Sequence, residues 1–150
     1  MTDTHQIEVE AMFPHAPELI WKTLTTGAMM ARWLRMDPKG FAPVVGTKFT
    51  YQTTPSGGWD GVIHCEVRDV VPNERLVYSW KGGHESIAEG YGAPLNTLVT
   101  FTLSPATNGT RLRLVHAGFV FPRNRLAHEN MGKGWKGVVQ TVGELTAKPD

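Results

Sequence analysis

Residues 131–145 of the chain read MGKGWKGVVQTVGEL, and this stretch decides the fold that the sequence predicts. Its large apolar residues recur at spacings of three or four and therefore share one face of a helix: Met131, Trp135, Val138, Val142 and Leu145. Four glycines interrupt the stretch, and each costs a helix up to about 1 kcal/mol relative to alanine. A helix with these penalties must gain its stability by packing on another part of the protein.

The sequence before this helix alternates between apolar and polar residues, which is typical of half-buried strands. The first alternation runs from Ile7 to Phe13. Later segments with the same period predict the remaining strands: 49–53, 59–71, 76–80, 99–103 and 112–116. Val70 and Val71 break the alternation, so we expect a bulge or bend there.

Two short helices are predicted between the first and second strands. Ala16, Ile20 and Leu24 recur every four residues, and a second apolar group spans 29–34. Strands that follow one another through turns favour an α+β fold with an antiparallel sheet. We therefore predict a curved antiparallel sheet of about six strands that grips the long C-terminal helix, with a space left between them.

Composition excludes several classes of protein. The chain has 150 residues, 41% hydrophobic and 19% charged, which argues against disorder. A net charge of +1 argues against a nucleic-acid partner. The single cysteine, Cys65, excludes an internal disulfide framework and a cysteine-rich zinc site. We expect no cofactor and no metal, because no phosphate-binding glycine loop, HExxH motif or metal-site spacing occurs. We expect no membrane insertion, because no apolar run approaches about 18 residues. The N-terminus has no signal-peptide pattern, so we expect a cytoplasmic protein. The length and the lack of a linker predict one domain over residues 1–150.

Several short motifs, in this order along the chain, carry a resemblance to a known family. They are residues 13–21 (FPHAPELIW), 32–34 (RWL), 61–63 (GVI), 71–80 (VPNERLVYSW), 110–116 (TRLRLVH), Gly118-Phe119 and Gly134-Trp135. This order resembles that of the START-like, helix-grip (SRPBCC) domains related to the activator of the heat-shock-protein-90 ATPase. The resemblance covers nearly the whole chain, from Ile7 to Leu145.

The resemblance implies a START-like ligand-binding domain with an apolar cavity between the sheet and the last helix. The superfamily includes carriers of lipids and other hydrophobic molecules, polyketide cyclases, stress-linked proteins and co-chaperones, so the fold alone does not fix the function. We expect a hydrophobic small-molecule ligand. A homodimer is compatible with the sequence, although no residue argues for it.

The candidate ligand-binding residues are those that the strand and helix periods turn inward. They are Trp33, Phe49, Tyr51, Trp59, Ile63, Tyr78, Trp80, Leu114, His116, Phe119, Met131, Trp135 and Val138. The tryptophans are either core anchors or walls of the cavity. His116 has the parity of two inward leucines, so it is either a satisfied core histidine or a polar group that orients a ligand. Cys65 is expected to be a small buried hydrophobe rather than a nucleophile.

Two other functions remain open from the sequence. An enzyme of the polyketide cyclase or dehydratase type needs two ionisable groups that converge in the same pocket. The candidates are His116, Tyr78 and, from the loop over 82–95, Glu89 or His84. A stress-related protein that docks on a chaperone would instead use the polar outer face of the sheet: Glu8, Glu10, His64, Glu66 and Arg68. No catalytic residue is assigned, and binding is favoured over catalysis.

The loop over 82–95 allows two interpretations of its own. It is rich in glycine and long for a connection between two strands. It is either a mobile surface connection or a lid over the mouth of the cavity.

Overall fold

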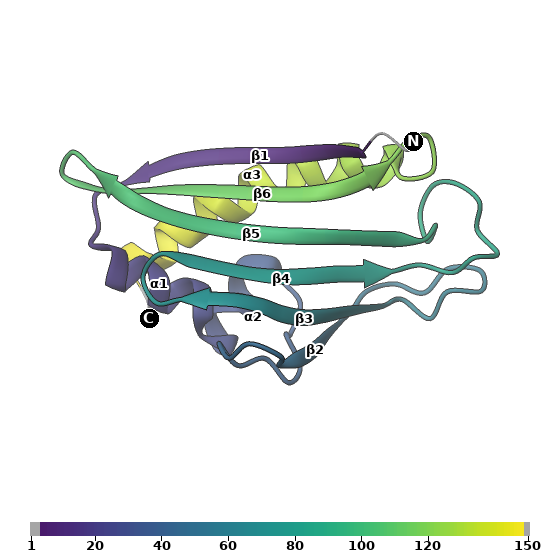
Figure 1. The fold of residues 1–150 in the computed structure, drawn as a ribbon, viewed down its shortest axis with the longest axis horizontal. Coiled ribbons are helices and arrows are strands. Elements are labelled where there is room, and N and C mark those ends of the chain that lie inside the picture. Colours follow the sequence, from purple (N-terminus) through teal and green to yellow (C-terminus); the bar gives the residue numbers. More distant parts are fainter. Residues whose placement is uncertain (1–3, 149–150) are drawn as a thin grey trace.

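The computed structural model describes residues 4–148 and has a six-stranded antiparallel sheet with three helices, which confirms the predicted α+β fold. The elements in chain order are β1 (Thr4–Phe13), α1 (Pro17–Thr25), α2 (Gly27–Leu34), β2 (Lys48–Gln52), β3 (Val62–Val71), β4 (Arg75–Gly82), β5 (Leu95–Ala106), β6 (Gly109–Val120) and α3 (Arg125–Ala147). Sheet order is β1-β6-β5-β4-β3-β2 (Figure 1).

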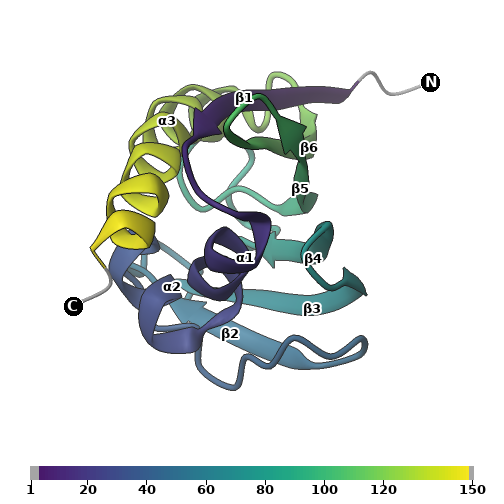
Figure 2. The ribbon, with the colours of Figure 1, turned by 90° about the vertical axis from the view of Figure 1, so that its left-hand side faces the viewer.

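The sheet curves around the helices. Figure 2 shows the three helices on the concave side, with α3 beside the β1 end and α1 and α2 toward the β2 end. The first strand pairs with the last, from Thr4 opposite Val120 to Phe13 opposite Thr110. The first and last strands of the chain are therefore neighbours in the sheet. The two edge strands are β1 and β2.

The third strand differs from its predicted limits. It begins at Val62 rather than at residue 59, because Ser56 and Trp59 close a tight turn and Gly61 follows with a φ of 79°. A side chain at Gly61 would collide with the carbonyl of Thr53, so the chain needs glycine there. The irregularity in strand pairing falls between Val67 and Asp69, two to three residues before the predicted position.

The C-terminal helix packs on the sheet through one buried stripe: Trp135, Val139, Val142 and Leu145. Burial of each such side chain contributes roughly 1.5–3 kcal/mol, which outweighs the cost of about 1 kcal/mol for each glycine. The predicted stripe also included Met131, which is half-buried, and had Val138 in place of Val139. Val138 is half-buried, and it faces the cavity described below.

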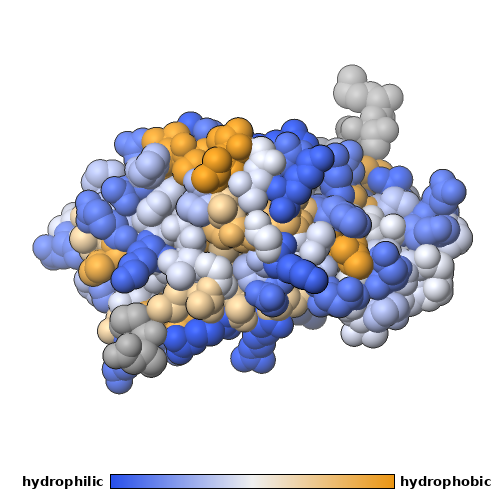
Figure 3. All heavy atoms as spheres, turned by 90° about the horizontal axis from the view of Figure 1, so that it is seen from below, coloured by the Kyte–Doolittle hydropathy of each residue, from blue (hydrophilic) through white to orange (hydrophobic). Residues whose placement is uncertain are grey.

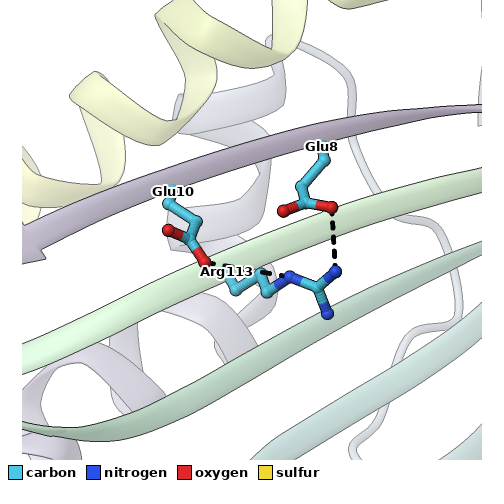
Figure 4. Close-up of polar contacts among 3 residues, drawn as sticks. All are labelled: Glu8, Glu10 and Arg113. Carbon is cyan, nitrogen blue, oxygen red and sulfur yellow. Dashed lines mark hydrogen bonds and ion pairs between the residues drawn. The ribbon is translucent and has the colours of Figure 1, made fainter.

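The outer face of the sheet is solvated. Arg113 on β6 forms an ion pair with Glu8 at 2.8 Å and with Glu10 at 3.9 Å, both on β1 (Figure 4). All three side chains are more than 40% exposed, so water and salt screen these pairs and they add little stability. His64 and Arg68 are also exposed on the outer face of β3.

Two glycines of α3 provide a matched test of this packing. A Cβ at Gly143 would lie 2.5 Å from the Phe13 ring of β1, whereas a Cβ at Gly132 would meet nothing within 4 Å. We expect Gly143→Ala to lower the free energy of unfolding by about 1–3 kcal/mol through overpacking. Gly132→Ala should raise it by up to about 1 kcal/mol through helix propensity. Urea unfolding of both variants checks the pair, and equal stabilisation by the two alanines would contradict the close approach of β1 to α3.

Candidate functional site

A cavity of about 520 Å³ lies on the inner side of the sheet, between β3–β4, α3, the end of α2 and the loop over 83–94. Folded domains hold few voids larger than a water molecule, so a space of this size is unusual in a core. The volume falls within the range of roughly 300–1,000 Å³ that is typical of small-molecule sites.

One face of α3 forms a wall of the cavity. Its members recur at spacings of one, three or four residues: Ala127, Asn130, Met131, Gly134, Gly137, Val138 and Thr141. This stripe runs beside the buried stripe that holds α3 to the sheet. Ala127, Gly134 and Gly137 are small, and a Cβ built at either glycine would meet no atom within 4 Å. The small residues therefore leave open the space that larger side chains would fill.

Large apolar side chains form the rest of the wall. Trp33 comes from α2, Trp59 from the turn before β3, Ile63 from β3, Trp80 from β4 and Trp135 from α3. The rings of Trp80 and Trp135 meet edge to face, with centroids 6.1 Å apart. Such pairs hold their rings in fixed orientations, so this part of the wall is rigid.

The structure divides the thirteen predicted ligand-binding residues into two groups. Seven line the cavity: Trp33, Trp59, Ile63, Trp80, Met131, Trp135 and Val138. The other six are buried in the core outside the cavity wall: Phe49, Tyr51, Tyr78, Leu114, His116 and Phe119. Eleven of the thirteen are buried, and Met131 and Val138 are half-buried. Phe119 is buried although the alternation of its strand places it opposite in parity to Leu114 and His116.

His116 is a fully buried histidine whose two ring nitrogens are both satisfied. Trp135 Nε1 donates to His116 Nδ1 at 2.9 Å, and His116 Nε2 lies 2.7 Å from the hydroxyl of Thr97. An indole N–H only donates, so Nδ1 is unprotonated and the neutral ring carries its proton on Nε2. Nε2 then donates to Thr97, whose hydroxyl donates to the carbonyl of Trp80 at 2.8 Å. This chain of hydrogen bonds joins α3 to β6, β5 and β4.

Burial and, to a lesser degree, the nearby His128 lower the pKa of His116 to about 3. His116 is therefore neutral in the folded protein, as its hydrogen bonds require. Its ring forms the support behind Trp135 and does not line the cavity.

The four residues considered above for catalysis do not converge at the cavity. Tyr78 and His116 are buried in the core, and His84 and Glu89 are exposed on the loop, so none of the four lines the wall. Burial raises the pKa of Tyr78 well above its usual value, which keeps the phenol protonated. Within residues 4–148, no three His, Cys, Asp or Glu side chains gather as a metal site would require.

The glycine-rich loop forms one side of the cavity. Gly90, Tyr91, Gly92 and Ala93 line it. The loop is held on both sides, because the Tyr91 hydroxyl donates to the Thr54 carbonyl and the Gly90 N–H donates to the Arg123 carbonyl. Gly90 and Gly92 both have a φ of 89°, a conformation that favours glycine.

Sequence reasoning missed part of the wall. The stripe of small residues on α3 was detectable, because Ala127, Gly134 and Thr141 are seven residues apart and so share a helix face. Arg35 and Met36 also line the cavity, directly after α2. No sequence pattern marks these two, since their position depends on how a short helix packs.

No broad apolar surface is visible on the face shown in Figure 3, where hydrophobic patches alternate with hydrophilic residues. The most exposed large hydrophobic residues of the described chain include Val44 and Val45, at 60% and 59%. Between residues 4 and 148, none of the helices has the length and hydropathy to cross a bilayer.

Residues 14–145 match the model of a protein family described as "Activator of Hsp90 ATPase homolog 1-like protein". Among solved structures, protein MLL2253 from Mesorhizobium loti is 35% identical to this chain, with a TM-score of 0.80 over 97% of this chain and 99% of that chain. The Aha1 dimer from Colwellia psychrerythraea is 20% identical, with a TM-score of 0.71 over 95% of this chain and 96% of that chain. No curated protein sequence matches the chain.

The depressed pKa of His116 predicts a pH-dependent stability. An unfolded histidine has a pKa of about 6.5, so the buried neutral ring stabilises the fold above that pH. This contribution is lost progressively as the pH falls from about 6.5 toward about 3. His116→Gln should cost about 1–3 kcal/mol at pH 7, because it disturbs the hydrogen bonds to Trp135 and Thr97.

The stability gap between the wild type and His116→Gln should shrink by about 1.4 kcal/mol for each pH unit below about 6.5. Urea unfolding of both proteins at about pH 7, 6 and 5 measures this gap. A gap that does not change with pH would contradict the buried, neutral state of His116.

Proposed function

Because the chain belongs to the activator of Hsp90 ATPase homolog 1-like family, as its motifs predicted, we propose that residues 1–150 act as one helix-grip domain that binds a hydrophobic small molecule between its sheet and α3. The ligand contacts the seven cavity-lining residues that the sequence predicted, together with Gly134 and Gly137. The domain is a binding module rather than an enzyme.

The observation that supports this proposal best is the way in which α3 builds the cavity. Two adjacent stripes of the same helix have opposite properties. One stripe is large and buried, while the other has glycine or alanine where a larger residue would close the space. Gly134 and Gly137 weaken the helix by about 1 kcal/mol each relative to alanine, and both line the cavity with no atom within 4 Å of their Cβ positions. An open wall for a ligand accounts for both.

The chemistry of the wall favours apolar ligands. Four of the five tryptophans of the chain line it. Transfer of apolar surface from water to such a wall releases roughly 25 cal/mol per Å² buried. Trp80 and Trp135 are 97% buried or more, so their rings are held in place before a ligand arrives. Little conformational entropy is then lost on binding.

A matched pair of helix variants tests the proposal. The probe is N-phenyl-1-naphthylamine, an uncharged dye whose fluorescence rises in apolar surroundings. Gly137→Leu adds a side chain that extends into the cavity, so it should weaken dye binding at least about tenfold. Gly132→Leu lies on the same helix but outside the wall, so it should bind like the wild type.

Both leucines should raise the free energy of unfolding, since leucine is a better helix former than glycine. Loss of binding in a variant that is at least as stable as the wild type separates a blocked cavity from a damaged fold. If the wild type shows no saturable dye binding, or if Gly137→Leu binds as well as Gly132→Leu, the cavity is not the binding site.

A further inference from the structure

The cavity wall contains a single charged side chain. Among its lining residues there is no aspartate, glutamate, lysine or histidine, and Arg35 alone carries a formal charge. The other polar contributors are neutral: Thr53, Tyr91, Asn130 and Thr141. An apolar cavity with one cation at its edge has the charge pattern that an amphiphilic molecule with one negative group would complement.

Arg35 forms no ion pair with any residue between 4 and 148. Arg75 pairs with Asp69, and Arg113 pairs with Glu8 and Glu10. Arg35 lines the cavity and is an exposed residue, so its charge stays in contact with water.

The backbone at residue 35 is another unusual feature. Arg35 follows the last residue of α2 with a φ of 61° and a ψ of 27°, which is the left-handed conformation. Glycine is the usual residue at such a helix end, because a Cβ is unfavourable there. An arginine at this position costs conformational energy, and its side chain must provide a benefit elsewhere for the cost to be offset.

We propose that the ligand is an anionic amphiphile, whose apolar body occupies the tryptophan-lined cavity and whose carboxylate binds Arg35 at the mouth. This inference rests on the proposed function, because it names the class of ligand for the same site. A guanidinium donates two parallel hydrogen bonds to a carboxylate, which gives it a geometric preference that a lysine lacks. The low dielectric of the neighbouring apolar wall strengthens the attraction relative to that on an open surface.

A simpler explanation assigns Arg35 to the fold alone. A cation at the C-terminus of a helix interacts favourably with the partial negative charge of the last carbonyls. This role predicts that removal of the charge lowers stability and leaves ligand preference unchanged. The proposed role predicts that removal of the charge abolishes the preference for an anionic ligand, whatever its effect on stability. An experiment that measures both quantities therefore separates the two roles.

The test compares two probes with the same apolar chain, dodecanoate and dodecanol, by their displacement of bound N-phenyl-1-naphthylamine below the concentration of micelle formation. The wild type should bind dodecanoate about three- to tenfold more tightly than dodecanol. Added salt should reduce this preference, because the ion pair lies at the surface. Arg35→Met should bind both probes equally, since methionine keeps an apolar stem without the charge.

Two further variants complete the design. Arg35→Gly should also abolish the preference, and it should raise stability because glycine suits the positive φ. Arg111→Met changes the net charge by the same amount but lies exposed on the outer face of β6, so it should keep the wild-type preference.

The outcomes distinguish this inference from the proposed function. If the dye and dodecanol bind but dodecanoate is not preferred, or if Arg35→Met keeps the preference, the anionic ligand class is wrong and the cavity assignment stands. If neither the dye nor either probe binds the wild type, both proposals are wrong. A preference lost equally in Arg111→Met would assign it to net charge and would overturn the role of Arg35.

Discussion

The hydrogen bond from Trp135 to His116 holds the last helix on the curved sheet, and the other features of the inner face depend on it. His116 satisfies the buried indole of Trp135, and Thr97 in turn satisfies His116. A buried donor without a partner costs about 1–3 kcal/mol, so the three groups specify one position of α3 over β4, β5 and β6. With the helix fixed there, its neighbouring stripe of small residues faces open space instead of the sheet, and a cavity results.

This arrangement explains how one helix both stabilises the fold and forms a wall of the cavity. Trp135 is shared between the two, because its ring lies in the buried stripe and also forms part of the cavity wall. Its neighbours on one side, Val139 and Val142, pack on the sheet, whereas Gly134 and Gly137 on the other side make no contact of that kind. The glycines that weaken the helix locally are tolerated because the buried stripe more than compensates for them.

Much of the fold was predictable because backbone geometry imposes its periods on the sequence. Alternation in Ile7–Phe13 and the three- to four-residue spacing of Met131–Leu145 predicted a strand and a helix that the structure confirms. Periodicity tells which side chains point inward, but it does not tell which inward residues border an empty space. Tyr51, Tyr78 and Leu114 therefore had the same pattern as Trp80, although packed side chains cover them. No sequence pattern marked Arg35, because its place in the cavity lining depends on the packing of α2.

The most direct measurement follows the indole N–H signals of the five tryptophans by NMR while the apolar ligand dodecanol is added. Trp33, Trp59, Trp80 and Trp135 line the cavity, and Trp21 on α1 does not, so the chain carries its own control. Binding in the cavity predicts saturable shifts of the four lining indoles with Trp21 unchanged. Shifts confined to Trp21, or no shift in any of the five, would contradict a ligand between the sheet and α3.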